Sequence, residues 1–427
     1  MHDVIVVGGG FAGVTAAREA ALRGRSVLLL EARDRLGGRT WRAPWDGHEI
    51  EYGGAWVHWH QPHSFSEITR AGLRVILGPD TEHASWFVDG RRRAAAPEER
   101  DAIAQRGWDR FVQGVEEALP LPHDPLFAID RLAFFDRLSV SERIDQLVLS
   151  EEERAVLVAE LESLTSAPLE HAGAVSVLRW HALSGYSLAL TQFTGGRVTI
   201  DGGTSALLGA IASAAEFERR LAAPVAAVSR TAAGVEVTTR DGTGFPARSV
   251  VVAVPINTLD RIEFSPALPE DKQAGIALGQ ASRGVKIFIH ARGEPLLTNS
   301  VRAGHPFGYL ASDTLFDDGS QQLIGFGPDA AACRLQDAGW VQRSLDELLP
   351  EYEVLEATAH DWLADEFARG TWAIHRPGWY EHHHAAMRRP EDRLLLAGSD
   401  LANGWAGFID GAIESGLRAG AWAAAIG

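Results

Sequence analysis

Only two lysines, Lys272 and Lys286, occur in a chain of 427 residues whose 40 lysine and arginine residues are otherwise all arginine. Lys286 stands inside the apolar segment GVKIFIH, which has the composition of a strand. A buried ammonium can hold one water molecule and changes its pKa readily, whereas the broad guanidinium of arginine stays charged. The position therefore indicates chemistry that needs lysine. The alternative is a solvated lysine at the edge of a strand.

A glycine motif near the N-terminus indicates phosphate binding. Gly8, Gly10 and Gly13 have G-x-G-x-x-G spacing between the strand-like segment DVIVV and the helical segment VTAAREAALRG. These glycines permit a tight turn, close approach of a pyrophosphate and close packing of helix on strand, and the helix N-terminus favours anions. Glu31 ends the next strand-like segment about 18 residues after Gly13, near the spacing of an acid that binds a ribose hydroxyl. The unit predicts dinucleotide binding.

The elements that position these residues fall in alternating blocks. Residues 247–255 and 393–400 are predicted strands of the same sheet, and the Ala- and Gly-rich helix that follows is expected to pack tightly on it. Residues 99–190 are predicted to be helical, and residues 284–365 to be rich in strands. The expected fold class is α/β, with a discontinuous Rossmann-type dinucleotide domain (1–75, 198–262 and 366–427) and a substrate domain of mixed sheet flanked by helices (76–197 and 263–365).

Charge, cysteine content and apolar runs argue against several classes of protein. The formal net charge of −17 argues against nucleic acid as a partner, because binding of phosphates needs a basic face. The single cysteine, Cys333, excludes an internal disulfide. No signal peptide and no apolar run long enough for a membrane span are visible, so a cytoplasmic protein without membrane contact is expected.

Six segments together resemble the flavin amine oxidase family, which includes monoamine oxidases, polyamine oxidases and bacterial nicotine-type oxidases. VGGGFAG, LLEARDRLGGRT and EYGGAWVHW resemble the N-terminal FAD signature, IDGGTSAL and LAAPVAAV the middle FAD segments, and NGWAGFIDGAIESGLRAG the C-terminal one. Within the family, GGAWVHWHQPH and the C-terminal segment are most similar to bacterial nicotine and pseudooxynicotine oxidases. The resemblance extends from one end of the chain to the other.

The resemblance implies FAD as the cofactor. It places Glu31 on the adenosine ribose, Arg39 near the pyrophosphate and the backbone of Val225 beside the adenine. It also places Trp362 beside the flavin ring and Asp400 near the ribityl chain and phosphates, where many members carry glutamate. The other implied cofactor-binding residues are Gly8, Gly10, Phe11, Ala12, Gly13, Ala32, Arg33, Gly38, Gly54, Ala55, Trp56, Gly398, Gly407, Phe408 and Ile409.

The resemblance also implies three catalytic residues. Lys286 matches the lysine that the family places beneath the flavin, where it holds a water molecule near N5. Trp372 and Phe408 match two rings that face each other before the flavin and form an aromatic cage for the amine; the alternative is ordinary packing in the core. Thr371 stands where mitochondrial monoamine oxidases have a cysteine bonded to the flavin, so FAD is expected to be non-covalent.

Further candidates concern the substrate pocket. His60, Trp180 and Tyr186 are candidates for its lining, with packing inside the protein as the alternative. The histidines at 58, 60 and 63 and at 382–384 are close in sequence, but nothing supplies a fourth ligand or a second shell, and no metal site is predicted.

The implied activity is oxidation of an amine, in particular a secondary or cyclic one, by transfer of a hydride from the α-carbon to flavin N5, which leaves an imine. The electron acceptor is expected to be O2 or a redox protein, and assembly as a homodimer is left open. Three alternatives stay in view: an amide or secondary-amine oxidase that forms rings in natural-product synthesis, an L-amino-acid oxidase, and a flavin-binding module without turnover. The amino-acid alternative needs a cation for the substrate carboxylate, and the sequence places no arginine there.

Overall fold

A strand–helix–strand unit opens the chain, and its buried strands form the centre of the first of two large sheets. The computed structural model describes residues 1–426. Strand β1 (His2–Val7) is parallel to β2 (Val27–Leu30) on one side and to β12 (Gly244–Val252) on the other. All four residues of β2 are buried, as expected for a parallel strand that is covered on both faces. Helix α1 (Phe11–Leu22) connects β1 to β2.

The first sheet has the strand order β13–β10–β11–β12–β1–β2–β9, with β19 also paired with β12. The additional strands are β9 (Glu218–Arg220), β10 (Val225–Thr231), β11 (Gly234–Thr239), β13 (Glu263–Ser265) and β19 (Leu394–Leu396). The two strands predicted from residues 247–255 and 393–400 are therefore confirmed as β12 and β19, and they are parallel. The predicted dinucleotide ranges contain every strand of this sheet except β13, which lies just past their boundary at residue 262.

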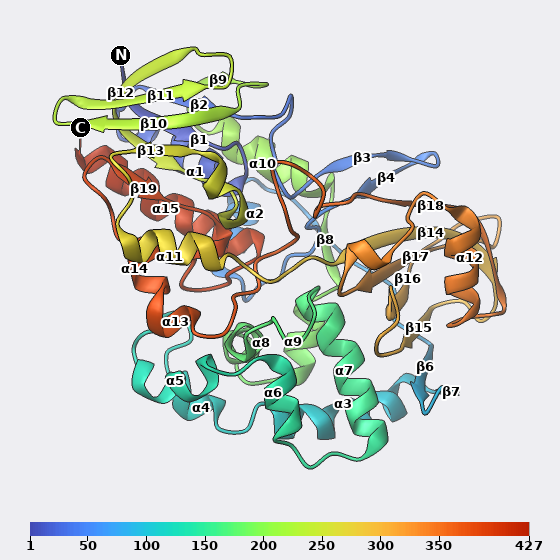
Figure 1. Cartoon of the computed structure of the whole chain (residues 1–427). Helices are drawn as coiled ribbons and strands as arrows, with labels where there is room; N and C mark the ends of the chain where they lie inside the picture. Colours follow the sequence, from blue (N-terminus) through green and yellow to red (C-terminus); the bar gives the residue numbers. More distant parts are fainter. Residues whose placement is uncertain (427) are drawn as a thin grey trace.

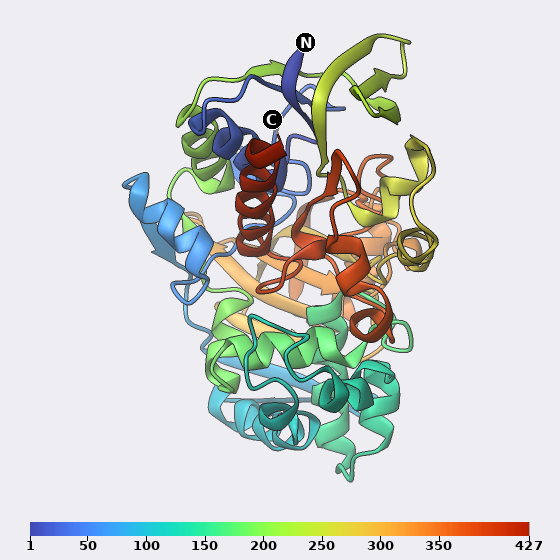
Figure 2. The same ribbon diagram turned by 90° about the vertical axis from the view of Figure 1, so that its left-hand side faces the viewer.

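The C-terminal helix α15 (Ile409–Ile426) was expected to pack on the sheet. It contacts β12, but its main neighbour is α1. A Cβ atom at Gly416 would lie 2.5 Å from Ala12 O, and one at Gly420 would lie 2.4 Å from Glu19 Cβ. The small residues therefore allow close contact between two helices. Because of this contact the two ends of the chain lie near each other (Figures 1 and 2).

The second sheet has the order β18–β14–β17–β16–β15–β6–β7. Its strands are β6 (His83–Val88), β7 (Arg91–Ala95), β14 (Val285–Gly293), β15 (Thr298–Val301), β16 (Tyr309–Leu315), β17 (Gln321–Gly327) and β18 (Tyr352–Ala359). Neighbouring strands are antiparallel except for the parallel pair β15–β6. This confirms the strand-rich region predicted for residues 284–365. The sheet also contains the β6–β7 hairpin from residues 83–95, which is distant in sequence.

Helices fill the predicted helical region between residues 99 and 190 and form the lower part of the molecule in the view of Figure 1, beside the β6–β7 end of the second sheet. They are α3 (Pro97–Phe111), α4 (Val115–Ala118), α5 (Ile129–Asp136), α6 (Val140–Asp145), α7 (Glu151–Thr165), α8 (Ala174–Leu183) and α9 (Leu188–Thr194). Ser139 and Ser150 start α6 and α7 with capping boxes, in which serine and glutamate satisfy each other's backbone N–H groups. Buried Trp108 and Phe111 join this layer to one large core.

The remaining elements connect these layers. The helices are α2 (Pro62–Arg70), α10 (Gly203–Ser213), α11 (Glu270–Leu278), α12 (Ala338–Asp346), α13 (Trp379–His382) and α14 (His384–Arg388), with 3-10 turns at Ile256–Arg261, Ala330–Ala332 and Ser399–Leu401. Two short antiparallel ladders pair β3 (Arg42–Trp45) with β4 (His48–Glu51), and β5 (Val75–Leu77) with β8 (Val198–Ile200). Within residues 1–426, no helix is long and apolar enough to cross a membrane.

Candidate active site

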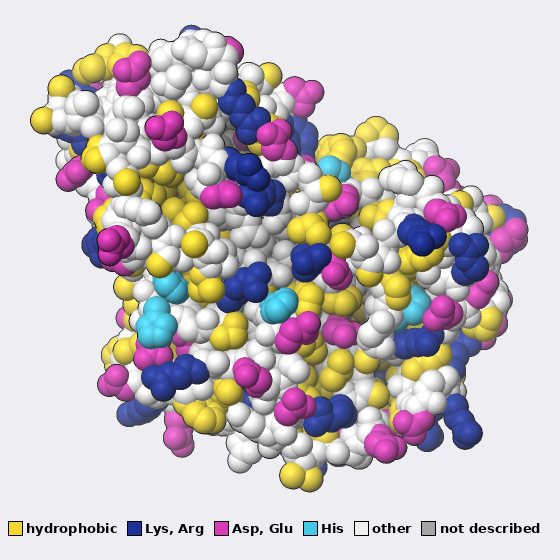
Figure 3. Space-filling view, viewed as in Figure 1, with side chains coloured by type: hydrophobic (Ala, Val, Ile, Leu, Met, Phe, Trp, Pro, Cys, Tyr) yellow, Lys and Arg dark blue, Asp and Glu magenta, His cyan; other side chains and the backbone are white. Residues whose placement is uncertain are grey.

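One large cavity lies where the two sheets and the helical layer meet. Its volume is about 780 Å³, within the range of roughly 300–1,000 Å³ that is usual for ligand and cofactor sites. Its lining includes the glycine turn after β1, the central strands of the second sheet and residues of α7 and α8. The surface is hollowed between the parts of the molecule that carry the two sheets (Figure 3). A ligand in this cavity would contact both halves of the fold.

The turn between β1 and α1 forms a cradle for phosphate. Gly8 has a φ of +103°, a region that side chains rarely adopt, and a Cβ atom at Gly13 would lie 1.9 Å from Gly8 O. At Gly10 the nearest atom to such a Cβ is 3.8 Å away, so a side chain would project into the cradle. Gly10 caps α1 without a side-chain hydrogen bond, which leaves N–H groups of the first helical turn available to an anion.

Charged groups flank the cradle at defined positions. Glu31 is buried at the end of β2, where its carboxylate accepts hydrogen bonds from the N–H groups of Gly9 (2.6 Å) and Arg33 (2.8 Å). Arg39 donates to Thr371 O (2.8 Å) and to the Ser399 hydroxyl (3.1 Å), and it forms an ion pair with Asp400. The carboxylates hold the turn and the arginine in place. The glycine cradle, the acid at the strand end and the fixed guanidinium fit the pyrophosphate and ribose of FAD.

Lys286 enters the cavity from β14, which is paired on both sides, with β17 and β18. Its Nζ donates to Glu51 O at 2.7 Å and to Gly53 O at 3.0 Å, and lies 4.7 Å from the centre of the Trp56 ring. Burial lowers the pKa of Lys286 to about 8, against the opposing charges of Asp313 and Glu51. An ammonium has three N–H donors, so one remains for a water molecule.

Aromatic side chains line the part of the cavity near Lys286. Trp372 lies 6.0 Å from Phe326 between ring centres and donates its indole N–H to Leu164 O at 3.0 Å. Phe408 lies 5.2 Å from Trp180. Trp372 and Phe408 line the same cavity, but within residues 1–426 no ring contact joins them to each other. The aromatic cage predicted from these two residues therefore stays a prediction, with both rings placed on the wall of one cavity.

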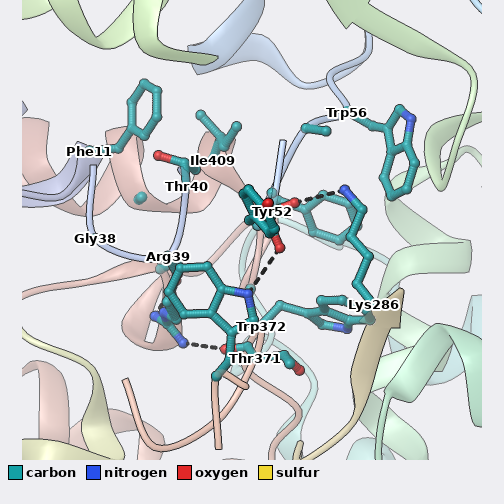
Figure 4. A pocket seen from close by; sticks show the side chains of 18 of the residues that line it. Phe11, Gly38, Arg39, Thr40, Tyr52, Trp56, Lys286, Thr371, Trp372 and Ile409 are labelled. Carbon is teal, nitrogen blue, oxygen red and sulfur yellow. Dashed lines mark hydrogen bonds between the residues drawn. The ribbon is translucent and has the colours of Figure 1, made fainter. Parts of the chain in front are cut away.

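In the close view, Lys286 and Trp56 lie on one side of the pocket, and Arg39 and Thr371 on the other (Figure 4). Tyr52 lies between the two sides, and its carbonyl oxygen accepts the indole N–H of buried Trp362 at 3.0 Å. These residues come from segments that are far apart in sequence. Only the fold brings them together.

Most of the predicted site residues line this one cavity. They are Gly8, Gly10, Phe11, Ala12, Glu31, Ala32, Arg33, Gly38, Arg39, Gly54, Ala55, Trp56, Trp180, Val225, Lys286, Trp362, Trp372, Gly398, Gly407, Phe408 and Ile409. Thr371 lines it as well, and its hydroxyl oxygen is buried without a hydrogen-bond partner. Sequence reasoning did not predict that this hydroxyl would be buried and unpaired.

Four predicted residues do not line the cavity. Gly13 is buried against Gly8, and Asp400 lies behind the wall, where it binds Arg39 and accepts the N–H of Ile256 at 2.9 Å. His60 hydrogen-bonds the Thr194 hydroxyl at 2.8 Å and packs on Trp405, which in turn contacts Phe408. Tyr186 donates to Leu119 O at 2.7 Å, on a separate small pocket. The predicted roles of Asp400, His60 and Tyr186 at the cofactor or the substrate stay predictions, and the structure shows the contacts that hold each of them in place.

Polar residues that sequence reasoning missed line the other end of the cavity. They are Arg100, Asp101 and Glu160 from the helical layer, and Asn299, Tyr309 and Asp313 from the second sheet. They belong to no motif, and alternation of polar and apolar residues does not distinguish a cavity wall from a solvated face. Within residues 1–426, no cluster of three or more His, Cys, Asp or Glu residues could hold a metal ion.

Comparisons with known proteins agree with this geometry. The family described as "Flavin containing amine oxidoreductase" matches residues 11–422. Pseudooxynicotine dehydrogenase of a Pseudomonas species is 36% identical over 428 residues, which cover 98% of this chain and 85% of the relative. (S)-6-hydroxynicotine oxidase of Paenarthrobacter nicotinovorans is 31% identical over 446 residues, covering 97% of each chain. Putrescine oxidase, solved with bound putrescine, has a TM-score of 0.83 at 24% identity and covers 98% of each chain, which shows the shared fold.

Proposed function

The chain belongs to the flavin-containing amine oxidoreductases, and on this premise we propose that it oxidises a secondary or cyclic amine. As a member of this family it is an enzyme that acts on amines with FAD as its cofactor. The alternative of a flavin-binding module without turnover is thereby set aside. Nicotine-type compounds carry secondary or cyclic amines, and the names of two relatives support this substrate class.

One observation carries the proposal: the cavity is continuous from the glycine cradle to the chamber lined by Trp372 and Phe408. FAD, when bound, accepts the hydride that leaves the carbon next to the amine nitrogen. Trp372 and Phe408 position the amine, and the apolar surroundings favour its neutral form. Lys286 holds a water molecule with its third N–H, while the carbonyls of Glu51 and Gly53 fix its direction.

Non-covalent binding of FAD belongs to the same proposal. The lining contains Thr371 where a thioether would need cysteine, and the single cysteine, Cys333, does not line the cavity. The proposal also includes O2 or a redox protein as electron acceptor, a cytoplasmic location and assembly as a homodimer. The FAD-binding domain would comprise residues 1–75, 198–262 and 366–427.

The cavity contains an arginine, but this arginine does not support the L-amino-acid alternative. Arg100 lines the cavity, yet its guanidinium already pairs with Asp101 and donates to Asn299. A substrate carboxylate would also face the buried carboxylate of Glu160. Two like charges close together are unfavourable in a poorly solvated site. An amine without a carboxylate fits this wall better.

The test is anaerobic mixing of the FAD-loaded enzyme with a panel of substrates. We expect secondary and cyclic amines to bleach the flavin absorbance faster than primary amines, amides or L-amino acids of similar size. Faster bleaching by an amide would support the ring-forming alternative, and faster bleaching by an amino acid would support the L-amino-acid oxidase. If no amine bleaches the flavin, the proposed function is wrong.

A further inference from the structure

A buried arginine of the helical layer holds a loop that belongs to the other half of the fold. Arg179 of α8 is 2% exposed, and its guanidinium donates to the carbonyl oxygens of Asn403 and, at 2.7 Å, of Gly404. It also donates to the hydroxyl of Tyr380, and its Cζ lies 4.9 Å from the centre of the Tyr380 ring. Because an unmade hydrogen bond to a buried charge is strongly unfavourable, these contacts fix the 403–406 loop.

The same loop is held from its other side by a carboxylate. Glu414 of α15 accepts the N–H groups of Asn403, at 2.8 Å, and of Gly404, at 2.7 Å. A cation thus binds the carbonyl oxygens of this segment, while an anion binds its N–H groups. Hydrogen bonds to charged groups are stronger than bonds between neutral groups, so the segment has one strongly preferred position.

The 403–406 loop leads directly to a ring in the wall of the cavity. Ala406 O accepts the indole N–H of Trp180, which follows the buried arginine on α8, at 3.2 Å. Gly407 has a φ of +87°, and a Cβ atom there would lie 2.9 Å from a carbonyl oxygen of the facing segment, so the chain has little freedom at this point. The Phe408 ring then lies 5.2 Å from the Trp180 ring. The position of the Phe408 ring therefore follows from the path of the loop.

A relay of hydrogen bonds connects Arg179 with the residues that precede the loop. Because a carbonyl oxygen only accepts, His375 Nε2 carries a proton and donates it to Asp400 O at 2.8 Å. Burial lowers the pKa of His375 to about 4, so the ring is neutral and its Nδ1 accepts the hydroxyl of Tyr380 at 2.9 Å. Tyr380 in turn accepts from Arg179, since a guanidinium only donates. The relay ends at the residue whose carboxylate forms the ion pair with Arg39 in the cavity.

We propose that Arg179 is a positioning residue for the oxidation of the amine, although it does not line the cavity itself. Through the 403–406 loop it sets where the Phe408 ring stands in the substrate chamber. Through the relay it holds the backbone of Asp400, and with it the guanidinium of Arg39 at the cofactor site. The inference rests on the proposed function, in which Phe408 orients the amine. One buried cation of the helical layer thereby aligns the substrate chamber with the cofactor site.

A double-mutant cycle tests the action of Arg179 on the substrate chamber. Arg179→Lys keeps the charge, but a single ammonium cannot reproduce the forked contacts of the guanidinium. With the secondary amine that bleaches the flavin fastest, we expect the variant to lower kcat/KM per bound flavin at least about tenfold, which corresponds to ~1.4 kcal/mol. In a Phe408→Ala background the same substitution should lower kcat/KM by less than about threefold, because the ring through which it acts is absent. Equal losses in both backgrounds, or no loss in either, would overturn the inference.

The action on the cofactor site is tested without any amine. Arg179→Lys and Tyr380→Phe both break the relay to Asp400, so each should release FAD several-fold faster than the wild type. The rise of flavin fluorescence after dilution of the FAD-loaded enzyme measures this rate. Unchanged release in both variants would contradict the proposed role of Arg179.

A matched control lies in the same helical layer. Arg143 is 8% exposed and donates to the carbonyl oxygens of Phe111 and Arg110, at 3.1 Å each. Its Cζ lies 5.4 Å from the centre of the Phe135 ring, and it does not line the cavity. Arg143→Lys should therefore keep both kcat/KM and the rate of FAD release, even where it lowers the melting temperature. Equal effects of Arg143→Lys and Arg179→Lys would indicate a general loss of packing and would overturn the inference.

A second variant keeps the inference testable where Arg179→Lys does not fold. Glu414→Gln offers one oxygen in place of two, so one of the two N–H groups of the 403–406 loop loses its acceptor. In the cycle with Phe408→Ala it should show the same non-additive loss. If no amine reduces the flavin of the wild type, the proposed function fails, whereas the release of FAD still decides whether Arg179 holds the cofactor site.

Discussion

Replacing Lys286 with methionine removes a buried ammonium and keeps a side chain of nearly the same length. Two effects on the free energy of unfolding oppose each other. Burial lowers the pKa of Lys286 from 10.5 to about 8, which at ~1.36 kcal/mol per pKa unit means that the buried charge destabilises the fold by about 3 kcal/mol at neutral pH. Methionine carries no charge, so the variant is stabilised by this amount. The carbonyls of Glu51 and Gly53 lose their donor, which costs ~1–3 kcal/mol each. We therefore expect little net change in stability and a retained FAD.

The kinetic effect should be larger than the effect on stability. We expect the reaction of the reduced enzyme with O2 to develop negative charge that the ammonium of Lys286 stabilises. At an effective dielectric constant of ~20, two unit charges ~4 Å apart interact by ~4 kcal/mol, and an intervening water molecule weakens this, so the variant should be slower by at least roughly tenfold. Since the pKa of Lys286 is about 8, the wild-type rate should fall as the pH rises through 8. The methionine variant should be slow at every pH, near the high-pH limit of the wild type.

Stopped-flow mixing of the reduced enzyme with oxygenated buffer at pH 6–10 measures this rate, and anaerobic mixing with amine measures flavin reduction, which should change less. Lys272→Met is the matched control. Lys272 is also buried, but it donates to Ala386 O and Arg389 O, at 2.6 Å each, and does not line the cavity. This control should keep both rates. A Lys286→Met variant that retains FAD, with unchanged rates and the wild-type pH profile, would refute the assigned position of Lys286.

Three further predictions concern the cofactor, the substrate and the cage. Because Thr371 stands where a linking cysteine would be, acid precipitation should release FAD into the supernatant, and flavin that stays in the pellet would contradict this. Flavin reduction by a basic amine should accelerate as the pH rises toward the amine pKa of ~10, because only the neutral amine has a free lone pair; a flat profile between pH 6 and 10 would contradict this mechanism. Trp372→Ala should lower kcat/KM at least tenfold, which corresponds to ~1.4 kcal/mol. The variant should lose less than the ~3–5 kcal/mol of unfolding free energy that is typical for removal of a core tryptophan, because the ring is only half-buried. Calorimetric melting together with steady-state kinetics per bound flavin checks the last prediction, and an early-melting variant with full activity would place Trp372 in the core.

The parts of the site that sequence reasoning predicted are local. The turn around Gly8 and Gly13 depends on backbone conformation and close contact between neighbouring elements, so the spacing of the glycines was enough to predict it. The apolar runs of β1, β2, β12 and β19 predicted buried parallel strands for the same reason. The family resemblance added the positions of Lys286 and Trp372, which now lie in one cavity.

The parts that it missed depend on contacts between distant segments. The ion pair between Asp400 and Arg39, for example, joins residues 361 positions apart, and it could not follow from residue type alone. Likewise, α15 was expected on the sheet, and only the assembled layers show that Gly416 and Gly420 face α1.

The sequence by itself determined that this chain binds a dinucleotide and resembles flavin amine oxidases, because short-range spacing and apolar periodicity encode turns and buried strands. The tertiary structure alone decided which polar residues share the cavity with Trp372 and Phe408. Glu160 and Arg100 look like ordinary charged residues on helices, and each is buried only because α3 and α7 pack beside the second sheet. Their proximity is set by packing over long sequence distances. The electrostatics of the substrate end therefore become visible only once the chain is folded.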